Sequence, residues 1–111
     1  MSVDVLKKIV AAAQAEGVDR GERARRVAAL IASARNFAWV GIVDVTGEEE
    51  MVLLGATGEA PMRERFSMPI AGAESASPMG LIDVVSKNGE YSHDDELFLD
   101  DASAAAVALF E

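Results

Sequence analysis

The chain has 111 residues, of which 50% are hydrophobic and 26% are charged, and this length suits a single domain with one core. Its formal net charge of −9 argues against binding to nucleic acid or to an anionic membrane surface, because both require a cationic face. It holds no cysteine, which excludes disulfides, a thiolate nucleophile and cysteine-ligated zinc.

The charge is divided unevenly along the chain. Residues 1–43 hold seven Lys or Arg against four acidic residues, whereas residues 44–111 hold three against fifteen. Two solvated faces are the simplest interpretation; a helix docked on the acidic part of the chain and a head-to-tail partner are the alternatives. No apolar run approaches the roughly 18 residues of a membrane span, and the first residues lack the apolar core of a signal peptide. We therefore expect a cytoplasmic protein.

Residues 1–35 are predicted to form two amphipathic helices. Apolar side chains recur at intervals of three and four over residues 2–16, and Gly17 follows as a stop. Asp19 with Glu22 three residues later has the form of a capping box, after which the same apolar spacing returns. The two apolar stripes are Leu6, Ile9, Val10 and Ala13, then Val27, Leu30, Ile31 and Ala34.

At Phe37 the apolar pattern changes from helical spacing to alternation, which predicts an antiparallel hairpin. Its strands are FAWVGIVDV and MVLLGAT, joined by the polar segment TGEEE. Alternation divides the first strand into two faces. One face carries Phe37, Trp39, Gly41 and Val43, and the other carries Ala38, Val40 and Ile42. The second set is smaller and would suit packing on alanine-rich helices.

Two further strands and a helix complete the predicted fold. RFSMPIA is a short strand that Pro69 restricts to a sheet edge, because proline cannot donate to the ladder. GLIDVVS is apolar enough for a central strand covered on both faces. Ser92 can cap a final helix whose first turn holds Asp94 and Asp95. The apolar stripe of that helix is Phe98, Ala102, Ala105 and Leu109.

Several of these segments together resemble the GAF domain, a sensory and ligand-binding relative of the PAS fold. They are AWVGIVDV, MVLLGATGEAP, SMPI and MGLIDVVSKNGEYSHDDELFLDDASAAAVALFE. The resemblance implies an α+β fold, with an antiparallel sheet of about four strands in the order 2-1-4-3 and the N-terminal and C-terminal helices on one face. We expect residues 1–111 to form one GAF-like domain, with two helices in 1–35 and the sheet and last helix in 36–111.

Among GAF proteins, the chain is most similar to the free methionine sulfoxide reductases, over most of residues 36–111. Residues 58–64 make only a brief loop, where that family has a long excursion that roofs the ligand pocket and carries its cysteines. The family's Pro-Ala-Cys step is Ala-Pro-Met at residues 60–62, and of two aspartates on the penultimate strand only Asp83 remains, with Val85 in the other place. Because that reaction needs a thiolate and a resolving thiol, the activity does not carry over.

The resemblance places a candidate ligand site on the sheet face of Trp39 and Asp83. A carboxylate within GLIDVVS is costly to bury alone, and the resemblance implies that Asp83 could recognise a cationic or hydroxyl-bearing ligand. Pairing of Asp83 with a loop amide or an arginine, or its exposure, is the alternative. Trp39 can stack on a ligand or serve as ordinary core. The other candidates are Phe37, Leu81 and Val85, and without a roof this apolar patch needs a second copy, a partner or the first helix to cover it.

Two other motifs are predicted to carry no chemistry. The acidic run that follows His93 is not a metal site, because consecutive helical residues point in different directions. The spacing LLGATG lacks the lysine and the following helix of a phosphate loop. We predict no metal, no cofactor and no catalytic residue.

The leading functional hypothesis is a non-enzymatic, GAF-like sensory or regulatory module in signalling, which acts through a small ligand or through dimerisation. The terminal helices are apolar enough for the dimeric bundle common in GAF proteins, so we expect a homodimer. One alternative is a degenerate relative of the sulfoxide reductases with residual enzymatic activity, which the lack of an evident nucleophile and base disfavours. The other is a structural subunit that docks on another protein.

Overall fold

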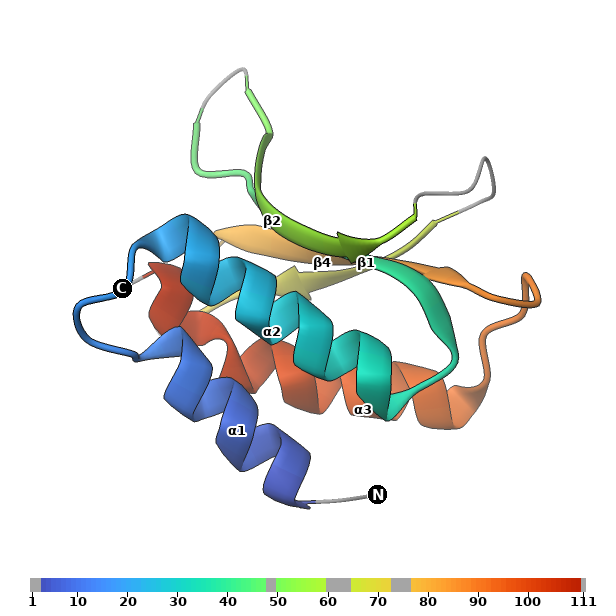
Figure 1. The fold of residues 1–111 in the computed structure, drawn as a ribbon. Coiled ribbons are helices and arrows are strands. Elements are labelled where there is room, and N and C mark those ends of the chain that lie inside the picture. Colours follow the sequence, from blue (N-terminus) through green and yellow to red (C-terminus); the bar gives the residue numbers. More distant parts are fainter. Residues whose placement is uncertain (1–2, 48–49, 60–64, 73–76, 111) are drawn as a thin grey trace.

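The computed structural model describes residues 3–47, 50–59, 65–72 and 77–110 (Figure 1). Two helices, α1 (Val3–Ala13) and α2 (Arg20–Ala34), precede four strands, β1 (Phe37–Asp44), β2 (Val52–Gly58), β3 (Phe66–Ile70) and β4 (Gly80–Ser86). Helix α3 (His93–Ala105) and a 3-10 turn, η1 (Val107–Phe110), complete the chain. Apart from η1, these are the predicted elements in the predicted order. No helix in the described ranges combines the length and apolar character needed to cross a membrane.

The four strands form one antiparallel sheet in the order β2-β1-β4-β3, as predicted. Strand β4 is the last in sequence but lies beside β1 in the middle of the sheet. Strand β3 lies at one edge, where Pro69 is tolerated because one side of an edge strand needs no ladder donor. All three helices lie on one face of the sheet (Figure 1). The chain is therefore an α+β fold whose helices cover one face of the sheet.

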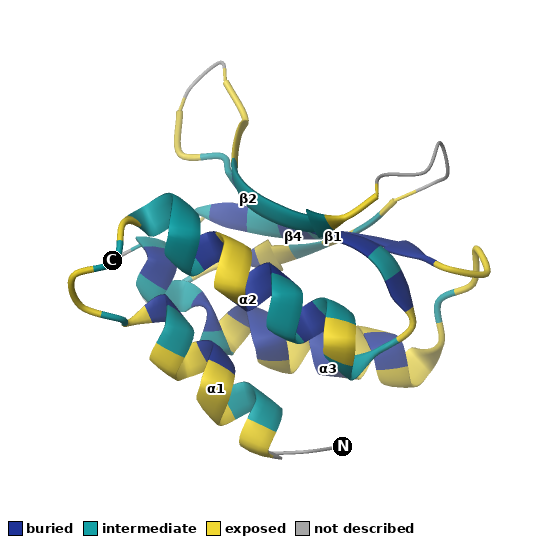
Figure 2. Cartoon of the chain, in the orientation of Figure 1, coloured by how far each residue is buried: buried dark blue, intermediate teal, exposed yellow. Residues whose placement is uncertain are grey.

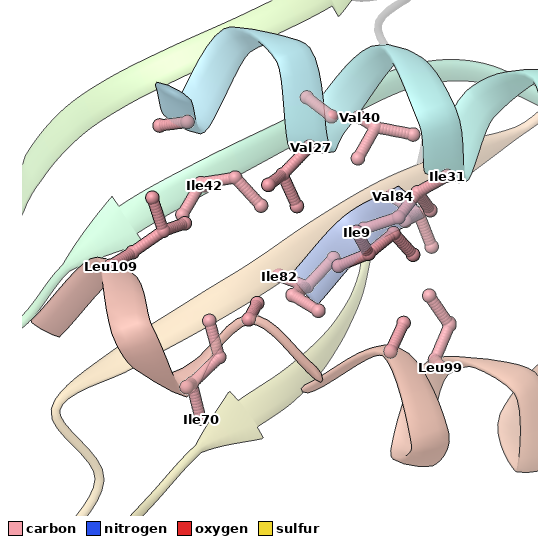
Figure 3. Packing of buried hydrophobic residues seen from close by; sticks show 14 of the residues in the cluster. Ile9, Val27, Ile31, Val40, Ile42, Ile70, Ile82, Val84, Leu99 and Leu109 are labelled. Carbon is pink, nitrogen blue, oxygen red and sulfur yellow. The ribbon is translucent and has the colours of Figure 1, made fainter. Parts of the chain in front are cut away.

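The hydrophobic core lies between the sheet and the helices (Figure 2). Helix α2 packs on β1 and β2, α3 packs on β3 and β4, and α1 packs against both helices. Figure 3 labels ten of the core side chains, namely Ile9, Val27, Ile31, Val40, Ile42, Ile70, Ile82, Val84, Leu99 and Leu109. Burying a side chain of this size stabilises the fold by roughly 1.5–3 kcal/mol. The predicted helical stripes supply much of this core, so they are already occupied within the chain.

The helices begin at the capping residues that the sequence indicates. At α2, the side chain of Asp19 accepts a hydrogen bond from the Glu22 N–H at 3.0 Å, while the Glu22 carboxylate accepts from Arg25. At α3, both halves of a capping box form: the Asp95 N–H donates to Ser92 Oγ at 3.1 Å, and the Ser92 N–H donates to Asp95 Oδ2 at 2.9 Å. Each cap stabilises its helix by about 1 kcal/mol.

Candidate functional site

The sheet face turned away from the helices carries the predicted site. On β1 and β4, alternate residues such as Val40 and Val84 belong to the core, so their neighbours point to the other side. We call that side the outer face. On the two central strands its residues form three cross-strand pairs, Trp39 with Val85, Gly41 with Asp83, and Val43 with Leu81.

Phe37 does not belong to the outer face, so its predicted position is wrong. A β-bulge lies between Phe37 and Trp39, because Phe37 pairs with Ser86 while Trp39 pairs with Val85, the adjacent residue on β4. The extra residue shifts the alternation of side chains. Phe37 is consequently turned toward the helices and joins the core, where it is 3% exposed.

Trp39 lies along the sheet and covers Gly41. A Cβ atom placed on Gly41 would lie 2.4 Å from Cη2 of the indole, closer than any real contact. The guanidinium carbon of Arg65 lies 4.5 Å from the centroid of the indole ring, within the range of a cation–π interaction. Trp39 is only 6% exposed. The indole therefore occupies the floor that a ligand would use, and it needs a glycine beneath it.

Asp83 is hydrogen-bonded to a residue of the neighbouring strand β3. Ser67 pairs with Asp83 across β3 and β4, and the Ser67 hydroxyl donates to Asp83 Oδ1 at 2.5 Å. This partner is a hydroxyl on a strand, which was not among the partners considered from the sequence. The carboxylate is partly buried, and a carboxylate can accept more than one hydrogen bond. It can therefore receive a hydrogen bond from a bound cation or hydroxyl group.

Part of the apolar surface of the outer face is buried within the chain. Val85 is fully buried, and Leu81 is partly exposed beside Val43. The first helix does not provide the cover, since α1 packs against α2 and α3 on the opposite side, and that option is wrong. Over Trp39 the described cover is Arg65.

Arg65 and Ser67 belong to the site but were not predicted as part of it. Both lie in the segment RFSMPIA, where period-two alternation places them on one side of the strand. The register of β3 against β4 turns that side to the outer face, because Ser67 pairs with Asp83. The alternation in RFSMPIA was visible in the sequence. Assigning Arg65 and Ser67 to the outer face also required the register of β3 against β4.

A hollow of about 550 Å³ lies at the start of α3, and three of its lining residues, Arg35, Ser92 and Asp95, are hydrogen-bonded to one another. Arg35 Nη2 lies 2.6 Å from Asp95 Oδ1, and Arg35 Nε donates to the same oxygen at 2.7 Å. Burial raises the pKa of the Asp95 carboxyl, but hydrogen bonds from Ser92 and from Arg35 outweigh it and hold that pKa below its ordinary value. These contacts join α2 to α3 and serve the fold.

A second polar hollow, of about 330 Å³, lies where α2, β1 and η1 meet. Arg20 occupies it: its Nη1 lies 2.8 Å from Asp44 Oδ2, and its Nε donates to the Leu109 carbonyl at 2.7 Å. The guanidinium carbon also lies 4.8 Å from the centroid of the Phe110 ring. Hydrogen bonds from the Thr46 hydroxyl and N–H, together with Arg20, lower the pKa of the Asp44 carboxyl. This cluster fixes the end of the described chain to its middle.

His93 is exposed at the first position of α3. Within the described ranges, no three His, Asp or Glu side chains gather where they could hold a metal ion.

The sequence matches no family model, and a search of the curated proteins finds no match either. Five solved chains are similar in structure. One of them is the GAF domain from an Acinetobacter phosphoenolpyruvate-protein phosphotransferase, with a TM-score of 0.71, 15% sequence identity, and coverage of 98% of this chain and 93% of that chain. Identity at this level establishes the fold and no subtype. The sheet order, the helices on one face and this structural likeness together show that the chain has the GAF fold.

Proposed function

We propose that the chain is a non-enzymatic regulatory or sensory module that binds a small ligand on the outer face, beside Trp39 and Asp83. The observation that carries this proposal is the indole of Trp39 covering Gly41, directly next to the Asp83 carboxylate. An aromatic ring, a carboxylate, a hydroxyl and a guanidinium thus gather on one face of two rigid central strands. Such a mixture of an apolar floor and a few polar groups is typical of small-ligand sites.

Binding would require Trp39 to move. With the indole displaced, the backbone of Gly41 and the Asp83–Ser67 pair form a floor without a bulky side chain. A ligand with an apolar body and a cationic or hydroxyl group would fit, because the carboxylate can accept its hydrogen bond. The displaced indole and Arg65 would then report binding to the rest of the molecule. This is how the module would act as a sensor.

The proposal excludes catalysis on the grounds of side-chain chemistry. The chain has no cysteine, and its single histidine, His93, begins a helix on the other side of the sheet from Asp83. The Ser67 hydroxyl donates to the Asp83 carboxylate, but among the described residues neither an imidazole nor a thiol accompanies this pair. We place the module in the cytoplasm, since a chain without cysteine gains no disulfide from an oxidising compartment.

The test is a ligand screen read by thermal unfolding and by the fluorescence of Trp39, the only tryptophan. A true ligand should raise the melting temperature and shift the emission, and Asp83→Asn should weaken both effects. Asp100→Asn, at an exposed position of α3, is the matched control and should leave them unchanged. Absence of any hit, or hits that are indifferent to Asp83→Asn, would refute the proposal.

The second candidate is a protein-interaction subunit, and one observation favours it. Met51, Val52 and Leu53 are consecutive, apolar and exposed. Substituting Trp39→Ala separates the two candidates. It should abolish ligand effects if Trp39 lines a ligand site, and it should abolish association if Trp39 lines an interface.

A further inference from the structure

The exposed apolar residues are concentrated at one edge of the sheet. In the described part of the chain, five large apolar side chains are exposed, and three of them are Met51, Val52 and Leu53, at 69%, 49% and 54% exposure. The other two are Val10 and Leu97, on separate helices. A run of three exposed apolar residues at the start of a strand is unusual unless the strand has a partner.

Strand β2 also lacks the usual protection of an edge strand. Proteins protect free edges with charged residues or proline, and β3 at the opposite edge carries Pro69. The seven residues of β2, VLLGATG, contain neither a charged residue nor proline. Among the described residues, the β2 backbone makes its ladder with β1 and has no other backbone partner. As far as the described ranges extend, the far side of β2 is thus available for a further strand.

The residue order of β2 makes the strand complementary to itself. Its first half is bulky, with Val52, Leu53 and Leu54, and its second half is small, with Gly55, Ala56, Thr57 and Gly58. If two copies of β2 run antiparallel about a two-fold axis at the centre, each bulky half lies opposite a small half. The same strand can therefore serve as both partners, as a two-fold interface requires.

A bulge at the centre of β2 makes this pairing consistent with the two faces of the sheet. Ile42 pairs with Gly55 and Val43 pairs with Leu53, so Leu54 is the extra residue. Leu54 packs on the core, and a Cβ on Gly55 would lie 2.6 Å from the backbone nitrogen of Arg25 on α2. Both residues consequently face the helices and share one position of the ladder.

Leu53 and Ala56, on either side of the bulge, face outward. The Cδ1 atom of Leu53 lies 3.1 Å from the position of a Cβ on Gly41, an outer-face residue, and Ala56 pairs with Gly41. A two-fold axis through the bulge places Leu53 opposite Ala56 of the second copy. Two residues further out, Met51 falls opposite Gly58, so outward residues meet outward residues on both sides of the axis.

We propose that two copies of this chain associate through antiparallel pairing of β2 with β2, which joins two four-stranded sheets into one of eight strands. Gly58 is the β2 residue that pairs with Trp39. Because Met51 of one copy lies opposite Gly58 of the other, it is separated from Trp39 of that other copy by one strand. Each copy therefore contributes a side chain to the border of the other's outer face. This inference does not depend on the small-ligand proposal.

The charges near the paired edge oppose the association in part. The acidic helix α3 packs beside β3, at the far edge of the sheet, so it does not meet the second copy. Helix α2 lies under β2, and there Arg25 and Arg26 share Glu22, at 2.5 and 3.5 Å. In the proposed register Glu50 of each copy lies opposite Glu59 of the other, and each copy carries a net charge of −9 overall. Because both repulsions are screened by salt, dimerisation should strengthen as ionic strength rises.

The first experiment is sedimentation velocity on the full chain over a concentration series. The native chain should show a concentration-dependent monomer–dimer equilibrium, and Leu53→Lys should be monomeric because it places a charge at the paired edge. Leu97→Lys, at a similarly exposed position of α3 (47%), is the control and should dimerise normally. Met51→Lys, at 69% exposure, provides a second variant in case Leu53→Lys does not fold.

The second experiment uses the absence of cysteine in the chain to test the register. Leu53→Cys and Ala56→Cys proteins are mixed and oxidised. Paired cross-strand cysteines form disulfides readily, so the mixed dimer should exceed either homodimer several-fold. A chain that stays monomeric at every concentration, a dimer that survives both lysine variants at β2, or a mixture without preference for the mixed disulfide would each overturn the proposal.

Discussion

The indole of Trp39 can lie over Gly41 because Gly41 has no side chain. The indole lies where a side chain on Gly41 would be, and the nearest ring atom is 2.4 Å from that Cβ position. Gly41 sits in the middle of β1 with no positive φ to explain it. The glycine is therefore required by packing on the outer face and by the position of Trp39, which fills the candidate ligand floor.

Gly41→Ala should displace the indole and destabilise the fold. Overpacking of this kind typically costs 1–3 kcal/mol, because the ring has to leave its position or the strand has to move. Urea unfolding followed by Trp39 emission would measure both the lower free energy of unfolding and a red-shifted native spectrum. Gly72→Ala is the control, since its Cβ would only reach an ordinary contact with Met79 at 3.4 Å. In a Trp39→Leu background, followed by circular dichroism, Gly41→Ala should cost much less, and an equal cost would mean that the clash is not with the indole.

The local elements were predictable because their signals are local. Helical spacing, capping residues, alternation and Pro69 act over a few residues, and each predicted element is present. The wrong face for Phe37 has a different origin. Alternation from Trp39 is interrupted by a bulge, and the bulge is defined by the pairing of Phe37 with Ser86, almost fifty residues later. Only the assembled sheet determines that register.

The pairing of Arg35 with Asp95 gives a prediction about acid stability. The folded-state pKa of Asp95 is held below its ordinary value of 3.8, so its contribution is complete above that pH and is lost as pH falls through the folded-state pKa. At neutral pH, Asp95→Asn should cost about 1.5–3 kcal/mol, the range for hydrogen bonds to charged groups. Urea unfolding should show a smaller difference in the free energy of unfolding between Asp95→Asn and the native chain at pH 3 than at pH 7.

Asp94→Asn is the matched control for Asp95→Asn. It changes the same chemical group one residue earlier, at an exposed position, and should leave stability nearly unchanged at both pH values. An equal loss at pH 7 and pH 3 for Asp95→Asn would mean that its charge does not contribute and that only the shape of the cap matters.

The partners of the charged residues could not be predicted as the helices could. Arg35 and Asp95 are 60 residues apart, and Arg20 and Leu109 are 89 apart. The sequence showed a basic first part and an acidic remainder, which limits which signs can meet but not which residues. In the structure, Arg20 at the start of α2 and Arg35 at its C-cap reach acidic or carbonyl oxygens of the later chain. The interpretation of two solvated faces is thus incomplete at these positions.

Arg20→Gln should loosen η1 without unfolding the domain. It removes an ion pair with Asp44, a hydrogen bond to the Leu109 carbonyl and a contact with the Phe110 ring. The Leu109 amide, which donates to the Ala106 carbonyl at 3.0 Å, reports on this turn. Its hydrogen exchange should accelerate by roughly 5–30-fold, corresponding to about 1–2 kcal/mol.

Arg26→Gln is the control for the loss of an arginine from α2. Arg26 is 48% exposed, and its Nε lies 3.5 Å from Glu22, so exchange at Leu109 should stay as in the native chain. If Arg26→Gln accelerates exchange at Leu109 as much as Arg20→Gln does, then the effect comes from the charge of α2 and not from the Arg20 contacts.

The last prediction concerns what covers Trp39. Arg65 lies 4.5 Å from the centroid of the indole ring, while Trp39 is 6% exposed. Removing Arg65 by Arg65→Ala should cost only about 0.5–1 kcal/mol, the range for exposed cation–π pairs. It should nevertheless raise quenching of Trp39 by acrylamide and shift its emission to longer wavelength. Lys8→Ala, which removes an exposed cation from α1, should change neither. If Arg65→Ala leaves quenching unchanged in the monomeric Leu53→Lys background, then the cover is another part of the same chain. If quenching rises only in that background, the second copy covers Trp39 in the dimer, and the ligand face and the dimer interface are coupled.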